Sequence, residues 1–170
     1  MNAISKIADP TSAPTLKDAM RLVAGGVSVV TAGDGEERTG LTVTSAVSLS
    51  IDPPTMIICV NRNASALAVI ARRRHFCVNV LAADHEAIAN RFAGVSGVKG
   101  PARYVEADWR PQATGALALQ GALASIDCEV EEMIERHSHV IVIGAVRAIT
   151  TQSGEPLVYS RGRYHRLAHS

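Results

Sequence analysis

The sequence predicts a mainly β protein of the α+β class, in which short strands form a small barrel with short helices packed around it. Three observations favour this fold class. The chain has 170 residues, 47% of them hydrophobic, which suits one compact domain. About seven short segments have the apolar or alternating pattern of strands, and two or three have the pattern of short helices. No regular crossover helices separate the strands, which argues against a doubly wound sheet.

The N-terminal region predicts a tail followed by one short helix. Residues 1–12 have the composition of a flexible tail, so we expect the folded domain to span 13–170. Thr15 and Asp18 have the spacing of a capping box, which opens a helix. The apolar side chains of this helix, which we expect to face inward, are Leu16, Ala19, Met20 and Val23. Gly25-Gly26 ends it.

The next three segments predict strands. Residues 27–31 are β-branched and apolar, and a glycine-containing turn at 32–35 leads into a second strand-like stretch over 39–50. The Asp52-Pro53-Pro54 sequence interrupts this pattern, because proline cannot donate a hydrogen bond to a strand ladder. The apolar run at 55–60 then predicts a buried strand.

Two further helices are predicted in the middle of the chain. Ser65 is the candidate N-cap of a helix that runs to Arg74. Asp84 is the candidate N-cap of a second helix over 86–92. The glycine-rich stretch at 94–101 predicts a mobile loop.

The rest of the chain is predicted to be mostly strand. The remaining strand segments are 75–81, 124–132, 140–146, 157–159 and 164–167. Within 124–132 the alternation places Ile126, Cys128 and Val130 inward and Asp127 and Glu129 outward. Arg161-Gly162 forms a tight turn between the last two strands.

Composition excludes several classes of protein. The formal net charge of +1 argues against a nucleic-acid-binding protein, and no apolar run reaches the roughly 20 residues needed to span a bilayer. The N-terminus has no apolar signal-peptide core. The cysteines Cys59, Cys77 and Cys128 are odd in number and far apart, as in a reduced cytoplasmic protein. His137 and His139 lack a third ligand at a diagnostic spacing, so we expect no metal site.

The chain also lacks the local motifs of enzymes that carry their own nucleophile or phosphate loop. Its most informative segment is instead rich in hydroxyl groups. Five of the nine residues from Thr42 to Ser50 are threonine or serine, and adjacent Thr44 and Ser45 place a hydroxyl on each face of a strand. Such a segment can line a polar ligand such as a phosphate, although an exposed strand rich in threonine has the same composition.

Beyond composition, the chain carries blocks whose order and spacing form a specific pattern over residues 17–167. These blocks are 26–31 (GVSVVT), 40–54, 59–65 (CVNRNAS), 76–81 (FCVNVL), 91–94 (RFAG), 121–130 (GALASIDCEV), 139–146 (HVIVIGAV) and 156–164. In this pattern the chain resembles the short-chain flavin reductases of two-component monooxygenases, within the wider FMN-binding split-barrel group.

The resemblance implies a six-stranded Greek-key split barrel that binds flavin without a covalent link and forms a homodimer. It implies hydride transfer from NADH or NADPH to FMN or FAD, with the reduced flavin released to a partner monooxygenase. The redox chemistry then belongs to the cofactors, while the protein orients them, which explains why no catalytic triad is found.

The resemblance also implies site residues. Those expected to line the flavin are Thr42, Val43, Thr44, Ser45, Ala46, Ser48 and Leu49. Those expected on its ribityl-phosphate side are Asn61, Asn63, Ser65 and Lys99. Phe92 and the C-terminal residues Tyr159, Arg161, Gly162 and Tyr164 complete the expected contacts with flavin and nicotinamide. For Phe92 a role as a core anchor, and for Lys99 a role as a solvated loop residue, remain open.

His139 resembles the family histidine of an Asp-His pair that lies near the nicotinamide, and it is the candidate catalytic residue. In this chain the preceding residue is Ser138 instead of aspartate, so the imidazole lacks its adjacent carboxylate. Many relatives carry an aromatic residue where Ser160 stands. Two alternatives to the reductase remain open, an electron-transfer protein with tightly bound flavin and a non-catalytic split-barrel binding protein.

Overall fold

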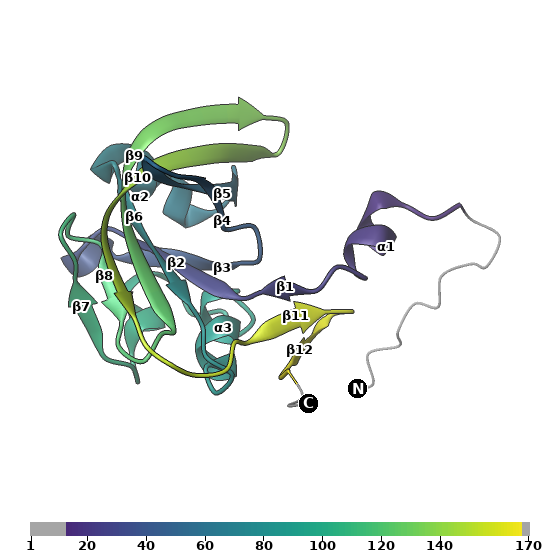
Figure 1. The fold of residues 1–170 in the computed structure, drawn as a ribbon. Coiled ribbons are helices and arrows are strands. Elements are labelled where there is room, and N and C mark those ends of the chain that lie inside the picture. Colours follow the sequence, from purple (N-terminus) through teal and green to yellow (C-terminus); the bar gives the residue numbers. More distant parts are fainter. Residues whose placement is uncertain (1–12, 168–170) are drawn as a thin grey trace.

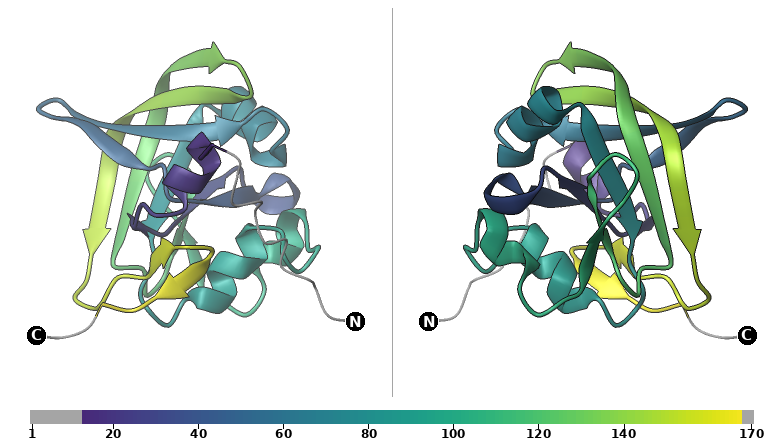
Figure 2. Two further views of the ribbon diagram at one scale, coloured as in Figure 1. Left: turned by 90° about the vertical axis from the view of Figure 1, so that its right-hand side faces the viewer. Right: turned by 90° about the vertical axis from the view of Figure 1, so that its left-hand side faces the viewer.

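The computed structural model describes residues 13–167, so the expected tail at 1–12 lies outside the described residues. Its main body is a seven-stranded antiparallel sheet with the order β3-β2-β6-β9-β10-β5-β4. The strands of this sheet are β2 (Ser28–Ala32), β3 (Thr39–Val43), β4 (Val47–Ile51), β5 (Pro54–Asn61), β6 (His75–Val80), β9 (Ala124–Arg136) and β10 (His139–Thr151). Within the described chain, β3 and β4 form the two edges and do not pair with each other. The strongly curved sheet is therefore a split barrel (Figures 1 and 2).

Smaller elements surround this barrel. The remaining strands are β1 (Gly25–Gly26), β7 (Trp109–Pro111), β8 (Leu117–Leu119), β11 (Val158–Ser160) and β12 (Arg163–His165). The helices are α1 (Leu16–Met20), α2 (Ser65–Arg73) and α3 (Glu86–Phe92), with short 3-10 turns at Gly35–Glu37 and Gly100–Tyr104. Strands β1, β11 and β12 form a separate sheet near α3 (Figure 1). The expected C-terminal hairpin, with Arg161-Gly162 at its turn, is confirmed.

Apolar side chains from the barrel strands and from the helices form two main cores. The barrel core contains Phe76, Ile58 and Val142 together with Ile70 of α2, all of them fully buried. A second core surrounds Phe92 of α3, and it includes Val29, Leu81, Tyr104 and Leu157. These buried apolar side chains are the main source of folding free energy.

A buried asparagine ties four strands together between these cores. Asn79 on β6 has no exposed surface. Its Oδ1 accepts hydrogen bonds from the backbone N–H of Leu119 and from the hydroxyl of Ser125, each at 2.8 Å. Its Nδ2 donates to the carbonyl of Val29 at 3.1 Å. Each amide atom therefore has a partner, which offsets the cost of burying this polar side chain.

Two expectations for the N-terminal half are wrong. The stretch over 39–50 is two strands at opposite edges of the sheet, because the chain leaves β3 at Thr44–Ala46 and crosses the split to β4. The capping box of α1 is confirmed, since Thr15 and Asp18 bond each other's backbone N–H. However, α1 ends at Met20 and its apolar face is not inward, with Leu16 78% exposed.

The candidate N-caps of α2 and α3 are also wrong by one position. Ala64 and His85 occupy the caps, and neither makes a side-chain capping hydrogen bond. Ser65 is instead the first residue of α2, with its hydroxyl 3.4 Å from that of Thr39. Asp84 precedes the cap of α3 and lies 3.8 Å from the ring Nε2 of His85.

Asp127 was expected to face outward from β9, but it is fully buried. Its carboxylate accepts hydrogen bonds from the backbone N–H of Thr114 at 2.8 Å and from the Thr114 hydroxyl at 2.6 Å. The loop before β8 covers this face of β9, so the charged residue in the alternating pattern is buried there and not exposed to solvent.

Among residues 13–167, no helix combines the length and hydrophobicity required to cross a bilayer.

Candidate active site

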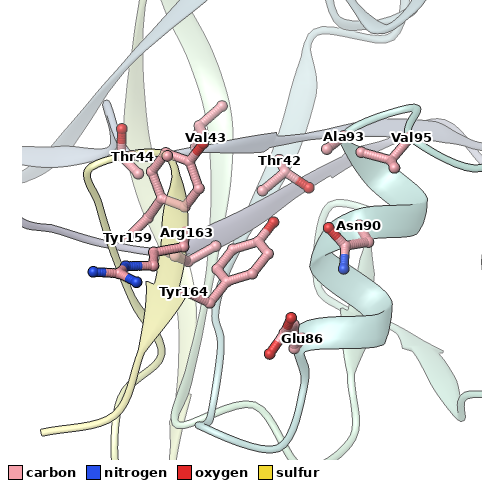
Figure 3. Close-up of a pocket in the computed structure, with 12 residues that line it drawn as sticks. Thr42, Val43, Thr44, Glu86, Asn90, Ala93, Val95, Tyr159, Arg163 and Tyr164 are labelled. Carbon is pink, nitrogen blue, oxygen red and sulfur yellow. The ribbon is translucent and has the colours of Figure 1, made fainter. Parts of the chain in front are cut away.

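A cavity of about 520 Å³ lies between β3, α3 and the β11–β12 hairpin (Figure 3). We call it the central cavity. It is lined by Val27, Thr42, Val43, Thr44, Glu86, Asn90, Ala93, Val95, Tyr159, Gly162, Arg163 and Tyr164. Its walls come from distant parts of the sequence, brought together by the packing of α3 and of the C-terminal hairpin beside β3. A concave surface that mixes apolar and polar groups in this way is typical of a ligand site.

Thr42 occupies the wall formed by β3. Its hydroxyl donates a hydrogen bond of 2.6 Å to the carbonyl of Ala89 on α3. Because the proton is used by that bond, the Thr42 oxygen presents its remaining lone pairs as acceptors. Thr42 therefore joins β3 to α3 and offers a fixed acceptor toward a ligand.

Two tyrosines form the wall opposite β3. Tyr159 and Tyr164 are directly opposite each other on β11 and β12, and their ring centroids lie 5.2 Å apart at 62°. In Figure 3 the ring of Tyr164 extends toward α3, where Glu86 and Asn90 lie. Burial raises the pKa of the Tyr164 hydroxyl, and the charges of Tyr159 and Glu86 raise it further. The Tyr164 phenol thus stays protonated near neutral pH and can act as a hydrogen-bond donor.

A second cavity, of about 410 Å³, adjoins the central cavity, and Thr42 and Ala93 line both spaces. We call it the basic cavity. Its lining residues are Gly40, Leu41, Thr42, Asn63, Ala64, Ser65, Phe92, Ala93, Lys99 and Arg103. Helix α2 begins at this cavity, and no side chain caps its N-terminus. Its first backbone N–H groups therefore have no side-chain acceptor from a capping residue. With Lys99 and Arg103 beside them, these N–H groups form a site suited to an anion such as a phosphate.

Arg103 is held in place within the basic cavity. Its guanidinium donates to the carbonyl of Val98 at 3.0 Å and also to the carbonyl of Gly40. Gly40 lies against the ring of Phe92, and a Cβ at Gly40 would be 2.8 Å from that ring. It would also lie 2.5 Å from the carbonyl oxygen of Val30. This close approach sets the position of β3 beneath the cavity and requires glycine.

The structure brings most of the expected site residues together. In the central cavity it places Thr42, Val43, Thr44, Tyr159, Gly162 and Tyr164. In the basic cavity it places Asn63, Ser65, Phe92 and Lys99. Phe92 also anchors the core as the sequence allowed, because only 2% of it is exposed and it packs on Tyr104 and Trp109. Arg161 lies in a neighbouring groove beside α1.

Other expected residues lie outside these cavities. The hydroxyl of Ser45 donates to the carbonyl of Cys59 at 3.2 Å, and Ala46 packs against the barrel core. Ser48 and Leu49 lie on the edge strand β4 and are exposed. Their expected contact with a flavin is therefore not made by the cavities of one chain, and it stays a prediction.

His139 opens β10 and is exposed, opposite the exposed Asn61 on β5. The hydroxyl of Ser138 lies 2.9 Å from the ring Nδ1 of His139, so a neutral group stands where the family pattern has a carboxylate. Neither His139 nor Asn61 lines the central or the basic cavity. The role of His139 near the nicotinamide stays a prediction.

Several residues that line the cavities were not expected from the sequence. Glu86 and Asn90 are four positions apart on α3, a spacing that places both on one face of a helix. That spacing was visible in the sequence, but it does not show which face of α3 meets the hairpin. Arg103, Val95 and Arg163 also line the cavities. Of these, Val95 lies in the stretch 94–101 that was expected to be only a mobile loop, and Arg103 lies in the 3-10 turn that follows it.

Neither buried thiol is suited to nucleophilic chemistry. Burial raises the pKa of the Cys77 thiol well above its usual range, and it raises that of Cys128 to about 12. Both therefore remain protonated near neutral pH, and a protonated thiol is a poor nucleophile.

Within residues 13–167 no three His, Cys, Asp or Glu side chains are grouped so that they could hold a metal ion.

Comparison with known proteins shows the family of this chain. A family model described as a flavin reductase like domain matches residues 20–168. The chain is 39% identical to FMN reductase (NADH) RutF 2 of Methylorubrum extorquens, over 96% of this chain and 94% of that protein. It is 34% identical to the 4-hydroxyphenylacetate 3-monooxygenase reductase component of Pseudomonas aeruginosa, over 89% of each chain.

Solved structures give the same result for the fold. The NADH:FAD oxidoreductase SgcE6 of Streptomyces globisporus superposes with a TM-score of 0.84 at 31% identity, covering 97% of this chain and 99% of that one. The styrene monooxygenase flavin reductase of Pseudomonas putida S12 superposes with a TM-score of 0.80 at 28% identity, covering 92% and 99%. The predicted split-barrel fold and the resemblance found in the sequence are confirmed, although the main sheet of the described residues has seven strands where six were expected. The chain belongs to the flavin reductase-like family.

Proposed function

We propose that this protein is an NADH-dependent flavin reductase that binds FMN or FAD in the central and basic cavities and supplies reduced flavin to a monooxygenase. The observation that carries the proposal is that the two cavities adjoin, since Thr42 and Ala93 line both of them. A ring system in the central cavity and a phosphate in the basic cavity match the two ends of a flavin nucleotide.

The residues present fit a flavin. The donor set of the basic cavity, with Lys99, Arg103 and the N-terminus of α2, suits a phosphate monoester. The absence of a side chain at Gly40 keeps β3 close to Phe92, beneath the cavity. Thr42 and Tyr164 supply one acceptor and one donor in the central cavity, which suits a heterocycle that carries both kinds of group.

The bound flavin supplies the redox chemistry, because its ring accepts a hydride from reduced nicotinamide. The chain's own residues bind and orient the reactants. Tyr159 and Tyr164 form an aromatic wall that packs against planar rings, and the buried side chain of Val43 adds apolar surface beside them. Such positioning lowers the entropic cost of hydride transfer without a catalytic acid or base.

The names of relatives support the finer parts of the proposal. FMN reductase (NADH) and NADH:FAD oxidoreductase support NADH as the reductant, and together they leave both flavins as candidates. Relatives named as the reductase component of a monooxygenase support a partner monooxygenase that receives the reduced flavin. The free thiols of Cys59, Cys77 and Cys128 support a reducing, cytoplasmic location.

We also propose a homodimer, on the basis of the exposed apolar side chains of β4. Val47 and Leu49 are each 54% exposed and Ile51 is 82% exposed. They lie on an edge strand of the main sheet, where an uncovered apolar face favours association. A second copy that covers this face would also stabilise the exposed edge.

The test of the proposed function is NADH and NADPH oxidation at 340 nm by purified protein, with and without added FMN, FAD or riboflavin. Oxidation that depends on added flavin is the expected result. Flavin binding without NADH or NADPH oxidation under any pairing would contradict the reductase and favour an electron-transfer protein. Protein that neither binds flavin nor oxidises NADH would favour a non-catalytic binding protein.

A second test addresses the basic cavity. Lys99→Gln removes one cation from the proposed phosphate site, so the affinity for FMN should fall by about tenfold relative to that for riboflavin, which has no phosphate. Fluorescence quenching of each flavin measures both affinities. An unchanged ratio of the two affinities would contradict the placement of the phosphate and favour a solvated loop residue.

A further inference from the structure

A third cavity, of about 400 Å³, lies between α1 and the turn of the β11–β12 hairpin. We call it the α1 groove. It is lined by Lys17, Met20, Arg21, Val23, Gly25, Thr44, Tyr159, Ser160, Arg161 and Gly162. Thr44, Tyr159 and Gly162 also line the central cavity, so the two spaces meet at these residues. The α1 groove and the basic cavity thus lie on either side of the central cavity.

The α1 groove has a strong positive charge. Lys17, Arg21 and Arg161 all line it, and among the described residues none of the three forms an ion pair. The nearby carboxylate is that of Asp18, which accepts hydrogen bonds from the backbone N–H and the hydroxyl of Thr15. Those bonds lower the pKa of Asp18, with smaller contributions from Arg21 and Lys17. The three cations therefore exceed the local negative charge.

The backbone positions Arg21 and Arg161 next to Gly162, which lines both the α1 groove and the central cavity. The N–H of Arg161 donates a hydrogen bond of 2.7 Å to the carbonyl of Arg21, which joins the hairpin turn to the end of α1. Arg161 has a φ of 51°, in the left-handed region that asparagine and glycine adopt more readily than arginine. At the same turn, a Cβ on Gly162 would lie 3.2 Å from the guanidinium of Arg21. A long cationic side chain is thus held at a position whose backbone does not favour it.

The α1 groove also has an apolar side. Met20 and Val23 line it and are 55% and 54% exposed. Exposed apolar side chains beside unpaired cations suit a ligand that combines a flat, weakly polar base with a diphosphate. Arginine binds phosphate oxygens in pairs, which favours a diphosphate over a single carboxylate.

We propose that the α1 groove binds the adenosine 5′-diphosphate half of a dinucleotide, with Lys17, Arg21 and Arg161 on the diphosphate and Met20 and Val23 against the adenine. The choice of ligand rests on the proposed function. Since the basic cavity on the far side of Thr42 suits the flavin phosphate, NADH is the dinucleotide that the arrangement favours, and FAD is the other source of the same moiety.

The direct test is binding of ADP to flavin-free protein, measured by isothermal titration calorimetry at low and moderate salt. Arg21→Gln and Arg161→Asn should each weaken ADP binding about tenfold, the loss expected when one charged contact to phosphate is removed. Asparagine at 161 tolerates the left-handed backbone, so the turn is retained. Arg110→Gln, which removes an exposed arginine on β7, is the matched control and should leave the affinity for ADP unchanged. Equal ADP affinities in all four proteins, or no ADP binding by the unaltered protein, would overturn the proposal.

Kinetics then distinguish the two sources of ADP. If the groove holds NADH, Arg21→Gln should raise the KM for NADH about tenfold relative to the KM for reduced nicotinamide mononucleotide, which lacks the ADP half. If it holds FAD, the same variant should instead change the preference between FMN and FAD. A variant that alters neither ratio would contradict the proposal even if flavin-dependent oxidation persists. ADP binding that depends on Arg21, in a protein that oxidises no NADH, would support the groove and overturn the proposed function.

Discussion

At the scale of single residues, the site depends both on residues that join the elements around the cavities and on residues that face a ligand. Thr42 does both, because its hydroxyl bonds α3 and leaves an acceptor toward the central cavity. Thr42, Tyr159 and Tyr164 were predictable from the sequence, since they lie within short sequence motifs of the family pattern. Glu86 and Asn90 were not, because their role depends on how α3 is rotated relative to the hairpin.

Thr42→Val should weaken flavin binding by about three- to tenfold, the effect of losing one neutral hydrogen bond. The fold should survive, because the carbonyl of Ala89 also accepts a hydrogen bond from the N–H of Ala93 at 2.9 Å. Thr42→Ser keeps the hydroxyl and is the matched control. Fluorescence titration with FMN measures the three affinities. Equal affinities of the valine and serine variants would contradict a role for the hydroxyl.

Gly40→Ala should destabilise the protein by about 1–3 kcal/mol, because the new methyl group overpacks a site closed by backbone and ring atoms. Its Cβ would lie 2.5 Å from the Val30 carbonyl oxygen and 2.8 Å from the ring of Phe92. Gly26→Ala is the matched control, since nothing lies within 4 Å of a Cβ there. Urea unfolding measures both. The prediction fails if the two variants lose the same stability.

At the scale of elements, the sequence predicted the bounds of several helices and strands closely. The strand at 55–60, the helix at 86–92 and the C-terminal hairpin lie within a residue or two of their predicted bounds. The prediction of one strand over 39–50 is wrong because the hydroxyl-rich middle of this stretch has the composition of a continuous strand. In the structure the chain crosses the split of the barrel there. No local pattern reports which edge of a sheet a strand will join.

Helix α3 should respond to acid through His85 at its N-cap. The ring Nδ1 of His85 accepts a 3.2 Å hydrogen bond from the N–H of Ala82, which requires a neutral ring. Burial lowers the pKa of His85 below 6.5, with a smaller opposing effect of Asp84. The unfolded chain therefore binds more protons than the folded chain just below pH 6.5. The free energy of unfolding should fall as pH decreases through that range.

His85→Gln removes this titration, so its free energy of unfolding should depend less on pH between about 5 and 7 than that of the unaltered protein. Urea unfolding at a series of pH values measures the slope of each protein. His137→Gln, which replaces an exposed histidine in the β9–β10 turn, is the control for the loss of one histidine. Identical slopes for all three proteins would show that His85 does not contribute.

At the scale of the whole molecule, the two edges of the split barrel differ. The side chains of β3 contribute to the cavities, whereas β4 presents apolar side chains outward. The exposed face of α1 and the exposed face of β4 were not predictable as exposed, because apolar side chains in a sequence read as core. One chain by itself does not provide the surface that would cover them.

Ile51→Glu should weaken self-association while leaving the fold intact, because Ile51 is 82% exposed and its replacement adds charge to the apolar face of β4. Val105→Glu, at an exposed apolar residue on another part of the surface, is the control. Sedimentation velocity over a range of protein concentrations measures the mass of each. A monomeric unaltered protein, or a dimer that persists in Ile51→Glu, would contradict the proposed interface.

The position of β3 at a sheet edge has one more consequence. Only β2 pairs with β3, so along its other side the peptide groups of β3 have no sheet partner among the described strands. Every residue except proline has the same backbone N–H and C=O groups, whatever its side chain. Hydrogen bonds between a ligand and these groups therefore depend little on which residue occupies the position. Recognition through an edge strand can therefore persist while the sequence of that strand drifts, and the loss in Thr42→Val should be partial.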